Sequence, residues 1–188
     1  MLPEQIKNHR EVVTLKDGTY VSLRPMIADD YDRLVEMYAA LSKEELRYFR
    51  HDVQNPATIR GWCDTLDYNK IIPLLALARE RIIGSASLHF FEGPKRHMAE
   101  VRIYMSKEFR KRGLGTKMLR ALVDLARRQG VHILTAEVIA DMTKVVKAFE
   151  QVGFASLCVL EDCFMFPDGD TADVVFMTMN LSPKGDEF

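Results

Sequence analysis

The chain has 188 residues, of which 47% are hydrophobic and 28% are charged, and these values are ordinary for one globular domain. A formal net charge of −1 argues against a nucleic-acid binder whose whole domain is basic. No apolar stretch reaches the roughly 18 residues that a membrane-spanning helix requires, so we expect no membrane partner. The N-terminus has no apolar core of the kind found in secretory signals, and we therefore expect a cytoplasmic protein.

The first third of the chain contains both strand and helix signals. Residues 12–15 and 20–24 are expected to form a strand pair, and Asp29 and Asp30 are suited to cap the helix that follows. The stretch 42–45 (Ser-Lys-Glu-Glu) has the form of a capping box and predicts a second, short helix. Pro56 fits the first turn of a third helix.

The rest of the chain is expected to begin with a group of consecutive strands, after which helices alternate with strands up to a final strand pair. Gly130 and Gly153 are placed to end two of these helices. We expect one domain over residues 1–188, with a core at 20–181 and a flexible tail at 182–188. The expected strands are 73–78, 81–91, 97–105, 131–139, 154–161 and 173–181, and the expected helices are 114–128 and 142–152.

Three cysteines, Cys63, Cys158 and Cys163, lack the spacing of metal ligands. Any disulfide scheme would leave one of them unpaired. We interpret them as reduced structural residues of a cytoplasmic protein, and we expect no bound metal.

The most informative segment is residues 110–117 (Arg-Lys-Arg-Gly-Leu-Gly-Thr-Lys), which lies between an expected strand and an amphipathic helix. Glycines let backbone N–H groups approach phosphate oxygens, and the start of a helix adds partial positive charge. Met118 stands where a dinucleotide-binding fingerprint would have its third glycine, and the chain has no P-loop string. The segment therefore indicates a diphosphate cradle, although an ordinary turn with a solvated basic edge would have the same pattern.

The motif Arg110-x-x-Gly113-x-Gly115 follows an Ala99-Glu100-Val101 strand and resembles the acetyl-CoA site of the GCN5-related N-acetyltransferases (GNAT). The resemblance covers about residues 22–179 and includes the helix-to-strand step at 148–154. The stretch 41–48 is similar to the bacterial protein-lysine acetyltransferase branch. The resemblance implies an α/β (α+β) fold whose mixed, mostly antiparallel sheet of six to seven strands is flanked by helices and splayed at the strand before the cofactor turn.

The same resemblance implies that acetyl-CoA is the co-substrate and that the backbone holds it. Main-chain groups of Ile103, Tyr104 and Met105 would pair with the pantetheine arm, which requires that strand to separate from its neighbour. Lys144 or Lys147 would reach the 3′-phosphate. The amides expected to wrap the pyrophosphate belong to Arg110, Lys111, Arg112, Gly113, Leu114, Gly115 and Thr116.

Glu100 is the expected catalytic residue. An alkylammonium with a pKa near 10.4 is neutral at pH 7 in only about 1 molecule in 2,500, so its acetylation needs a proton acceptor. In the resembling family a glutamate at this position serves as general base, and the apolar residues around Glu100 lead us to expect a raised pKa. The other interpretation is a surface glutamate paired with Arg102, and the two are compatible.

Other residues keep alternatives open. Glu137, on the next strand, is a second candidate base or a partner that raises the pKa of Glu100. His89 and His97 are candidate proton shuttles. Phe149 stands where many relatives have a tyrosine acid, and Met142 stands where many have an asparagine that contacts the cofactor. We therefore expect direct attack by the amine without a tyrosine acid.

The predicted activity is transfer of an acetyl group from acetyl-CoA to a primary amine, either a small molecule or a protein lysine. One alternative is a CoA-binding sensor or scaffold that has lost transfer, which Met142 and the missing tyrosine would suit. A second is a nucleic-acid-binding module that uses residues 107–117, although we expect no nucleic-acid partner. The assembly state, monomer or homodimer, stays open.

Overall fold

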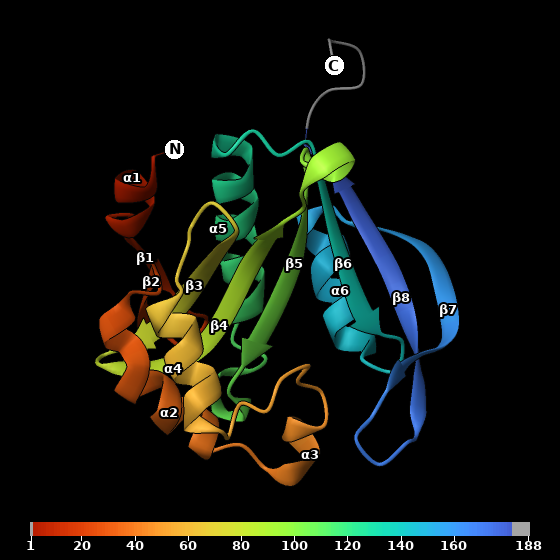
Figure 1. Cartoon of the computed structure of the whole chain (residues 1–188), viewed down its shortest axis with the longest axis horizontal. Coiled ribbons are helices and arrows are strands. Elements are labelled where there is room, and N and C mark those ends of the chain that lie inside the picture. The colour runs from red at the N-terminus through yellow and green to blue at the C-terminus, as the bar shows by residue number, and fades with distance from the viewer. Residues whose placement is uncertain (1, 182–188) are drawn as a thin grey trace.

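An eight-stranded sheet forms the centre of the molecule (Figure 1). The computed structural model describes residues 2–181. The strand order is β1-β2-β3-β4-β5-β6-β8-β7; β5 and β6 run parallel, and the other neighbouring strands are antiparallel. The strands are β1 (Glu11–Thr14), β2 (Tyr20–Pro25), β3 (Ile71–Ala78), β4 (Arg81–Phe90), β5 (Met98–Met105), β6 (Ile133–Ile139), β7 (Ala155–Met165) and β8 (Thr171–Asn180).

The expectation of a mixed, mostly antiparallel sheet flanked by helices is confirmed, but the sheet has eight strands rather than six to seven. The expected strand pair at 12–15 and 20–24 is present, and because β2 also pairs with β3, both of its strands belong to the one sheet. Ile6, Val13 and Leu15 are also buried in the main apolar cluster. The packed core therefore extends upstream of residue 20, where we expected it to begin. The expected tail at 182–188 lies outside the described residues.

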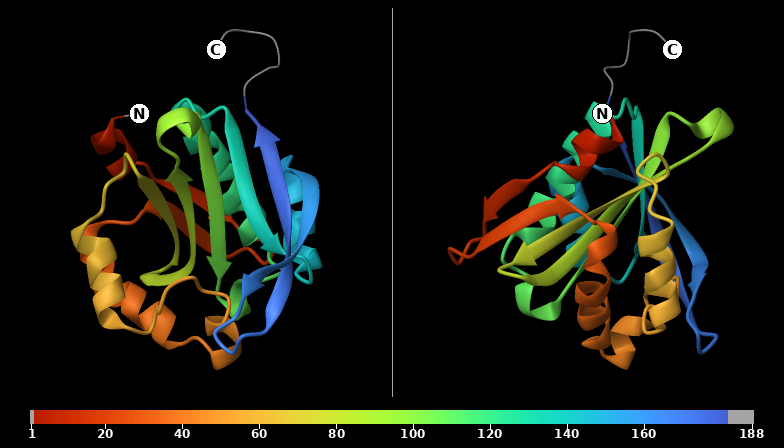
Figure 2. Two further views of the ribbon diagram at one scale, coloured as in Figure 1. Left: turned by 45° about the vertical axis from the view of Figure 1, so that its right-hand side comes forward. Right: turned by 60° about the vertical axis from the view of Figure 1, so that its left-hand side comes forward.

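Helices cover both faces of the sheet (Figure 2). One apolar cluster joins α2 and α4 to the sheet, and the other joins α5 and α6 to the opposite face. Among residues 2–181, no helix combines the length and the apolar character needed to cross a membrane. The helices are α1 (Pro3–Lys7), α2 (Tyr31–Ala39), α3 (Lys43–Leu46), α4 (Pro56–Asp64), α5 (Leu114–Arg128) and α6 (Thr143–Val152).

Two local sequence patterns position the helices next to the site. The capping box is present: the Ser42 hydroxyl accepts a hydrogen bond from the Glu45 amide, and a Glu45 carboxylate oxygen accepts one from the Ser42 amide. In α5, Leu114, Met118 and Leu122 recur every four residues and are all buried. This apolar stripe fixes α5 against the sheet and thereby places its N-terminus at the end of β5.

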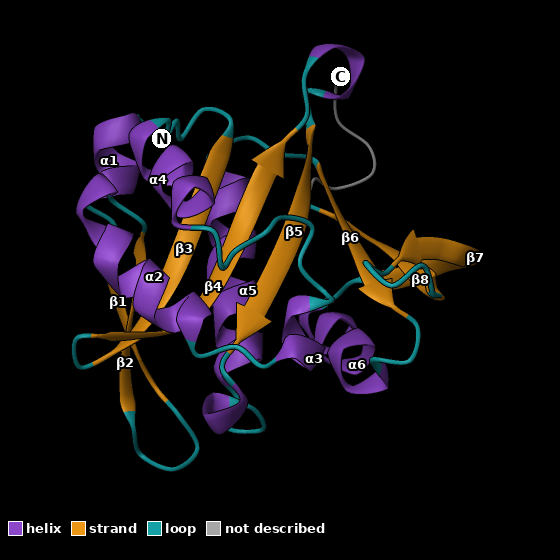
Figure 3. Cartoon of the chain, turned by 60° about the horizontal axis from the view of Figure 1, so that its bottom comes forward, coloured by secondary structure: helices purple, strands orange, loops and turns teal. Residues whose placement is uncertain are grey.

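The parallel pair β5–β6 is hydrogen-bonded over only part of its length. Its last register pair is Glu100 with Thr135, whereas β5 continues to Met105 and β6 to Ile139. On its other side β5 remains paired with β4 as far as Met105. The two strands consequently diverge toward their C-terminal ends, as Figure 3 shows, and the expected separation of this strand from its neighbour is present.

Candidate active site

The glycine turn between β5 and α5 has the geometry expected of an anion cradle. Gly113 precedes α5 with φ +85°, in the left-handed region that favours glycine, and Lys111 also has a positive φ of 63°. A Cβ atom on Gly115 would lie 2.8 Å from Cε of Met105. Because the first N–H groups of a helix have no intrahelical acceptors, the turn offers a row of donors for a diphosphate.

The two arginines of this turn have carboxylate partners. Arg112 donates to Asp17 (2.7 Å) in the turn between β1 and β2. Arg110 donates from Nη2 to Glu45 (2.9 Å) and from Nε to the carbonyl of Met105 (3.0 Å). These contacts brace the turn from two sides. Its backbone amides, rather than these two side chains, are therefore the groups best placed to receive phosphate oxygens.

The predicted pantetheine-binding residues lie along the diverging part of β5. Ile103 and Met105 pack against the core on the α5 side, while Tyr104 packs with the α2–α4 cluster. Leu114 is buried and Thr116 half-buried in the first turn of α5. β5 and β6 are parallel and α5 packs on α6, so Lys144, exposed in the first turn of α6, belongs to the same end of the sheet.

Glu100 lies at the point where β5 and β6 part, and only 8% of its surface is exposed. Arg102, two residues further on the same strand, donates from Nε to Oε1 (3.0 Å) and from Nη2 to Oε2 (2.6 Å) of Glu100. The anticipated pairing with Arg102 is therefore present, and it holds a carboxylate that is buried rather than on the surface.

The expected rise in the pKa of Glu100 is wrong. Burial alone would raise this pKa, but the hydrogen bonds from Arg102 and the charges of Arg102 and Arg50 outweigh it, so the pKa of Glu100 lies below its usual value. The sequence pattern showed the apolar neighbours of Glu100. It did not show that a second arginine, Arg50, lies beside the same carboxylate.

Arg50, in the connection between α3 and α4, joins the two candidate bases. Its Nη2 lies 2.7 Å from Oε2 of Glu137 and 3.3 Å from Oε1 of Glu100. Glu137 is on β6, beyond the last residue of that strand that pairs with β5. Arg50 was not among the predicted site residues, because nothing in its sequence neighbourhood points to a partner so distant along the chain.

The two histidines occupy different places. His89 stands opposite Glu100 in the β4–β5 register, and its Nε2 lies 2.8 Å from Oγ of Ser87. Burial, reinforced by the nearby charge of Arg102, lowers the pKa of His89 to about 4, so the ring is neutral at pH 7. The His97 ring lies beside that of His132, with the two centroids 6.1 Å apart, just before β5 begins. Of these two histidines, only His89 therefore lies next to Glu100.

The two residues that depart from the family pattern lie in α6 and at its N-cap. Phe149 is buried in α6 and packs edge-on against Phe154, with ring centroids 5.0 Å apart. Met142 forms the N-cap of α6. Neither side chain can donate a proton.

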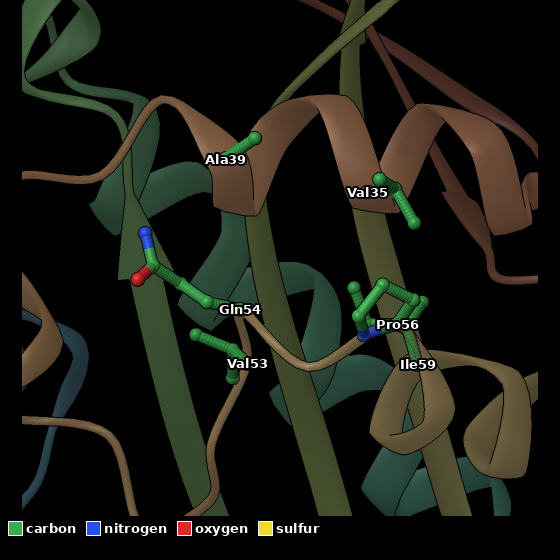
Figure 4. Close-up of a pocket in the computed structure, with 6 residues that line it drawn as sticks. All are labelled: Val35, Ala39, Val53, Gln54, Pro56 and Ile59. Carbon is green, nitrogen blue, oxygen red and sulfur yellow. The ribbon is translucent and has the colours of Figure 1, made fainter.

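A hollow of about 720 Å³ lies beside the Arg50 segment. A smaller hollow of about 300 Å³, between α2 and α4, is lined by apolar side chains and Gln54 and carries no titratable group (Figure 4). Within residues 2–181, no three histidine, cysteine, aspartate or glutamate side chains gather in a way that would hold a metal ion. The larger hollow is lined by Lys43, Glu44, Leu46, Arg47, Phe49, Arg50, His51, Asp52, Val53, Pro167 and Asp168.

A sheet that opens next to a glycine turn at a helix start is suited to bind the diphosphate and the extended arm of an acyl-CoA, as an acyltransferase requires. The chain belongs to the acetyltransferase (GNAT) family, whose model matches residues 34–154. It is 29% identical over 136 residues to an L-methionine sulfoximine/L-methionine sulfone acetyltransferase of Pseudomonas aeruginosa, covering 68% of this chain and 75% of that protein.

Solved structures share the fold. The GNAT domain of PAT from S. lividans superposes with a TM-score of 0.75 at 23% identity, covering 96% of this chain and 99% of that one. The yncA protein of Salmonella typhimurium, solved with its cofactor acetyl-CoA, has a TM-score of 0.75 at 19% identity, covering 88% and 96% of the two chains. The protein is thus an acetyl-CoA-dependent N-acetyltransferase, and its diverging strands and glycine turn suit that co-substrate.

Proposed function

We propose that the enzyme acetylates a primary amine, with Glu100 as general base. The observation that carries this proposal is the place of Glu100, which is the last residue of β5 to pair with β6 before the two strands diverge. A co-substrate arm that enters between the strands from their open end would present its acyl group near that point. A carboxylate there is within reach of an incoming amine.

The cofactor-binding role is assigned to the backbone. Main-chain groups of Ile103, Tyr104 and Met105 would receive the pantetheine arm, and the amides of residues 110–116 would receive the pyrophosphate. Lys144 would approach the 3′-phosphate. When bound, acetyl-CoA supplies an activated acetyl thioester, and main-chain amides near Met105 would polarise its carbonyl.

Glu100 has the ionisation state that a proton acceptor needs. Its lowered pKa keeps the carboxylate charged at neutral pH, so it can hold an ammonium before it takes a proton. Glu100 accepts one proton from the ammonium, directly or through a water molecule. The neutral amine then attacks, and its nitrogen gives up a second proton to water as the new carbon–nitrogen bond replaces the carbon–sulfur bond. Glu100 or water returns one proton to the sulfur, and the other proton leaves to solvent. Phe149 cannot serve as the acid in this last step.

The acceptor class is a small amine or a lysine side chain. The hollow beside Arg50 carries both cationic and anionic side chains, which suits an acceptor that has more than one charged group. The Pseudomonas relative, an L-methionine sulfoximine/L-methionine sulfone acetyltransferase, supports a small amino acid as the acceptor.

The proposal is tested by measuring thiol release from acetyl-CoA with methionine sulfone, methionine sulfoximine, Nα-acetyl-lysine amide and a lysine-rich protein. We expect at least one primary amine to be acetylated and the Glu100→Gln variant to lose most of this activity. Equal turnover by wild type and Glu100→Gln across pH 6–9 would show that Glu100 is not the base.

A further inference from the structure

A single nitrogen of Arg50 lies between two carboxylates of the candidate active site. Nη2 is 2.7 Å from Oε2 of Glu137 and 3.3 Å from Oε1 of Glu100. The contact with Glu137 is a charge-assisted hydrogen bond, and the contact with Glu100 is a longer ion pair. An alkylammonium, which has one nitrogen and three N–H donors, has the charge and the donors that this position requires.

The position of this nitrogen matters as much as its partners. Glu100 is on β5 at the last register pair with β6, and Glu137 is on β6 beyond that pair. Nη2 of Arg50 therefore bridges the two strands where they begin to separate. This is the place where the proposed function requires the acceptor amine to meet the acyl group.

The two arginines at Glu100 differ in how firmly they are held. Arg102 belongs to the same strand as Glu100 and makes two hydrogen bonds to it. Arg50 reaches the carboxylates from another segment, and 40% of its side chain is exposed. Arg102 is nearly as exposed (34%), so the two differ in their contacts: Arg102 makes two hydrogen bonds to Glu100, and Arg50 makes one longer ion pair to it. Arg50 is therefore the cation that a ligand can displace.

The backbone that carries Arg50 is anchored on both sides of the site. Phe49 packs between Tyr38 and Tyr104, with ring centroids 5.7 Å and 5.1 Å away. Tyr48 packs edge-on against Phe166, with centroids 5.7 Å apart, close to the β7–β8 turn. Displacement of Arg50 therefore needs only rotation of its long side chain, whereas the segment itself stays in place.

We propose that Nη2 of Arg50 marks the subsite of the acceptor's amino nitrogen and that the acceptor's ammonium replaces it between Glu100 and Glu137. The inference rests on the proposed function for the identity of the ligand. In the acceptor complex, Glu137 is a positioning residue that holds the ammonium and Glu100 takes its proton. Arg50 competes with the acceptor in the free enzyme and neutralises the two carboxylates until an acceptor binds.

A different role for Arg50 would have the opposite effect. A guanidinium can also bind the carboxylate of an amino-acid acceptor. Loss of Arg50 would then weaken binding of such an acceptor, whereas loss of a competitor strengthens binding. A pair of acceptors that differ only in the carboxylate separates the two roles: methionine sulfone and its decarboxylated form, 3-(methylsulfonyl)propylamine.

The experiment measures KM and kcat for both acceptors at saturating acetyl-CoA. In Arg50→Gln we expect KM for the decarboxylated amine to fall about three- to fivefold, the range that loss of a weak competing ion pair allows. Arg50→Lys should restore KM toward the wild-type value, because it returns a cation. Arg127→Gln is the matched control, since Arg127 is 51% exposed and pairs with Asp124 in the last turns of α5.

Glu137→Gln provides a second, independent readout. We expect KM for the amine to rise several-fold while kcat changes little, which a merely structural role would not produce. An unchanged or raised KM for the decarboxylated amine in Arg50→Gln would overturn the proposal. A KM that rises for methionine sulfone alone would also overturn it and would make Arg50 a carboxylate-binding residue.

Failure of the proposed function can be distinguished from failure of this inference. If no amine is acetylated, calorimetry of the CoA-bound protein with n-butylammonium chloride still probes the cation subsite. Tighter binding to Arg50→Gln than to wild type supports the subsite without any turnover. Equal or weaker binding rejects it, and thermal unfolding of each variant verifies that the protein remains folded.

Discussion

Glu100 and Thr135 form the last register pair of the β5–β6 ladder, and the two strands separate immediately beyond this pair. The Glu100 carboxylate is therefore buried, yet it lies next to the opening between β5 and β6. Its charge is compensated by Arg102 and Arg50. This combination of burial, position and compensated charge makes Glu100 the centre of the predictions that concern catalysis.

Replacing Glu100 by glutamine should reduce kcat about 10²- to 10⁴-fold, because the amide cannot accept the proton of the amine. The affinity for CoA should change little, since the cofactor is expected to contact other residues. Thiol release and calorimetry with CoA measure the two effects. Glu108→Gln is a suitable control, because Glu108 is an exposed glutamate that pairs with Arg81 away from this carboxylate.

Substitution of Gly115 by alanine should weaken CoA binding. The added Cβ would lie 2.8 Å from Cε of Met105, so the Met105 side chain must move on the strand that is expected to hold the pantetheine arm. Because Cε is the free end of a flexible side chain, we expect the Kd for CoA to rise about two- to fivefold, less than the ~1.4 kcal/mol of a tenfold change. Calorimetry measures the Kd. An unchanged affinity would mean that this contact is not part of the cofactor site.

Substitution of Gly113 by alanine should reduce both stability and CoA affinity. The positive φ of 85° costs an L-residue about 1–2 kcal/mol, and relaxing that strain would turn the amides of the cradle away. Gly130→Ala is the matched control, because Gly130 also has a positive φ and follows the far end of α5. The control should lose similar stability in urea unfolding and keep its affinity for CoA. Equal loss of affinity in both variants would argue against the cradle.

The buried pair Arg24–Asp30 should be important for folding. Asp30 is fully buried and accepts two hydrogen bonds of 2.6 Å from Arg24 and one of 2.9 Å from the Ile27 amide. Asp30→Asn leaves the arginine charge without its partner, and we expect a loss of about 3–5 kcal/mol. Urea unfolding of this variant beside Asp29→Asn, at an exposed neighbour, measures the difference. A loss below about 1 kcal/mol would contradict the prediction.

His89 should make stability depend on pH in a defined window. Burial lowers its pKa in the folded protein to about 4, from an ordinary value of 6.5. Between these values the unfolded chain binds more protons, so the stabilisation from neutral His89 is complete above pH 6.5 and is lost as pH falls toward 4. We expect about 1–2 kcal/mol from this group. Unfolding at several pH values should show a shallower dependence in His89→Gln than in the wild type.

Much of the scaffold could be predicted from local patterns. The glycine turn, the apolar stripe of α5 and the capping box at Ser42 depend on residues close in sequence, and the structure contains all three. The N-terminal helix α1 was missed, because five residues with little periodicity become helical only where Ile6 can pack against the core.

The electrostatics of the site could not be predicted in the same way. The pairing of Glu100 with Arg102 follows from the two-residue repeat of a strand, which puts both side chains on one face. The contact of Arg50 with Glu100 and Glu137 joins three segments that have no local relation, and it reverses the expected direction of the pKa of Glu100.

The sequence by itself determined the glycine turn, the family and the order of strands and helices after α1, because backbone conformation and apolar periodicity act over a few residues. Tertiary structure alone decided which charges surround Glu100. Coulomb interactions depend on distance in space. Arg50 comes within 2.7 Å of Glu137 only when the segment between α3 and α4 packs against the sheet that contains β6.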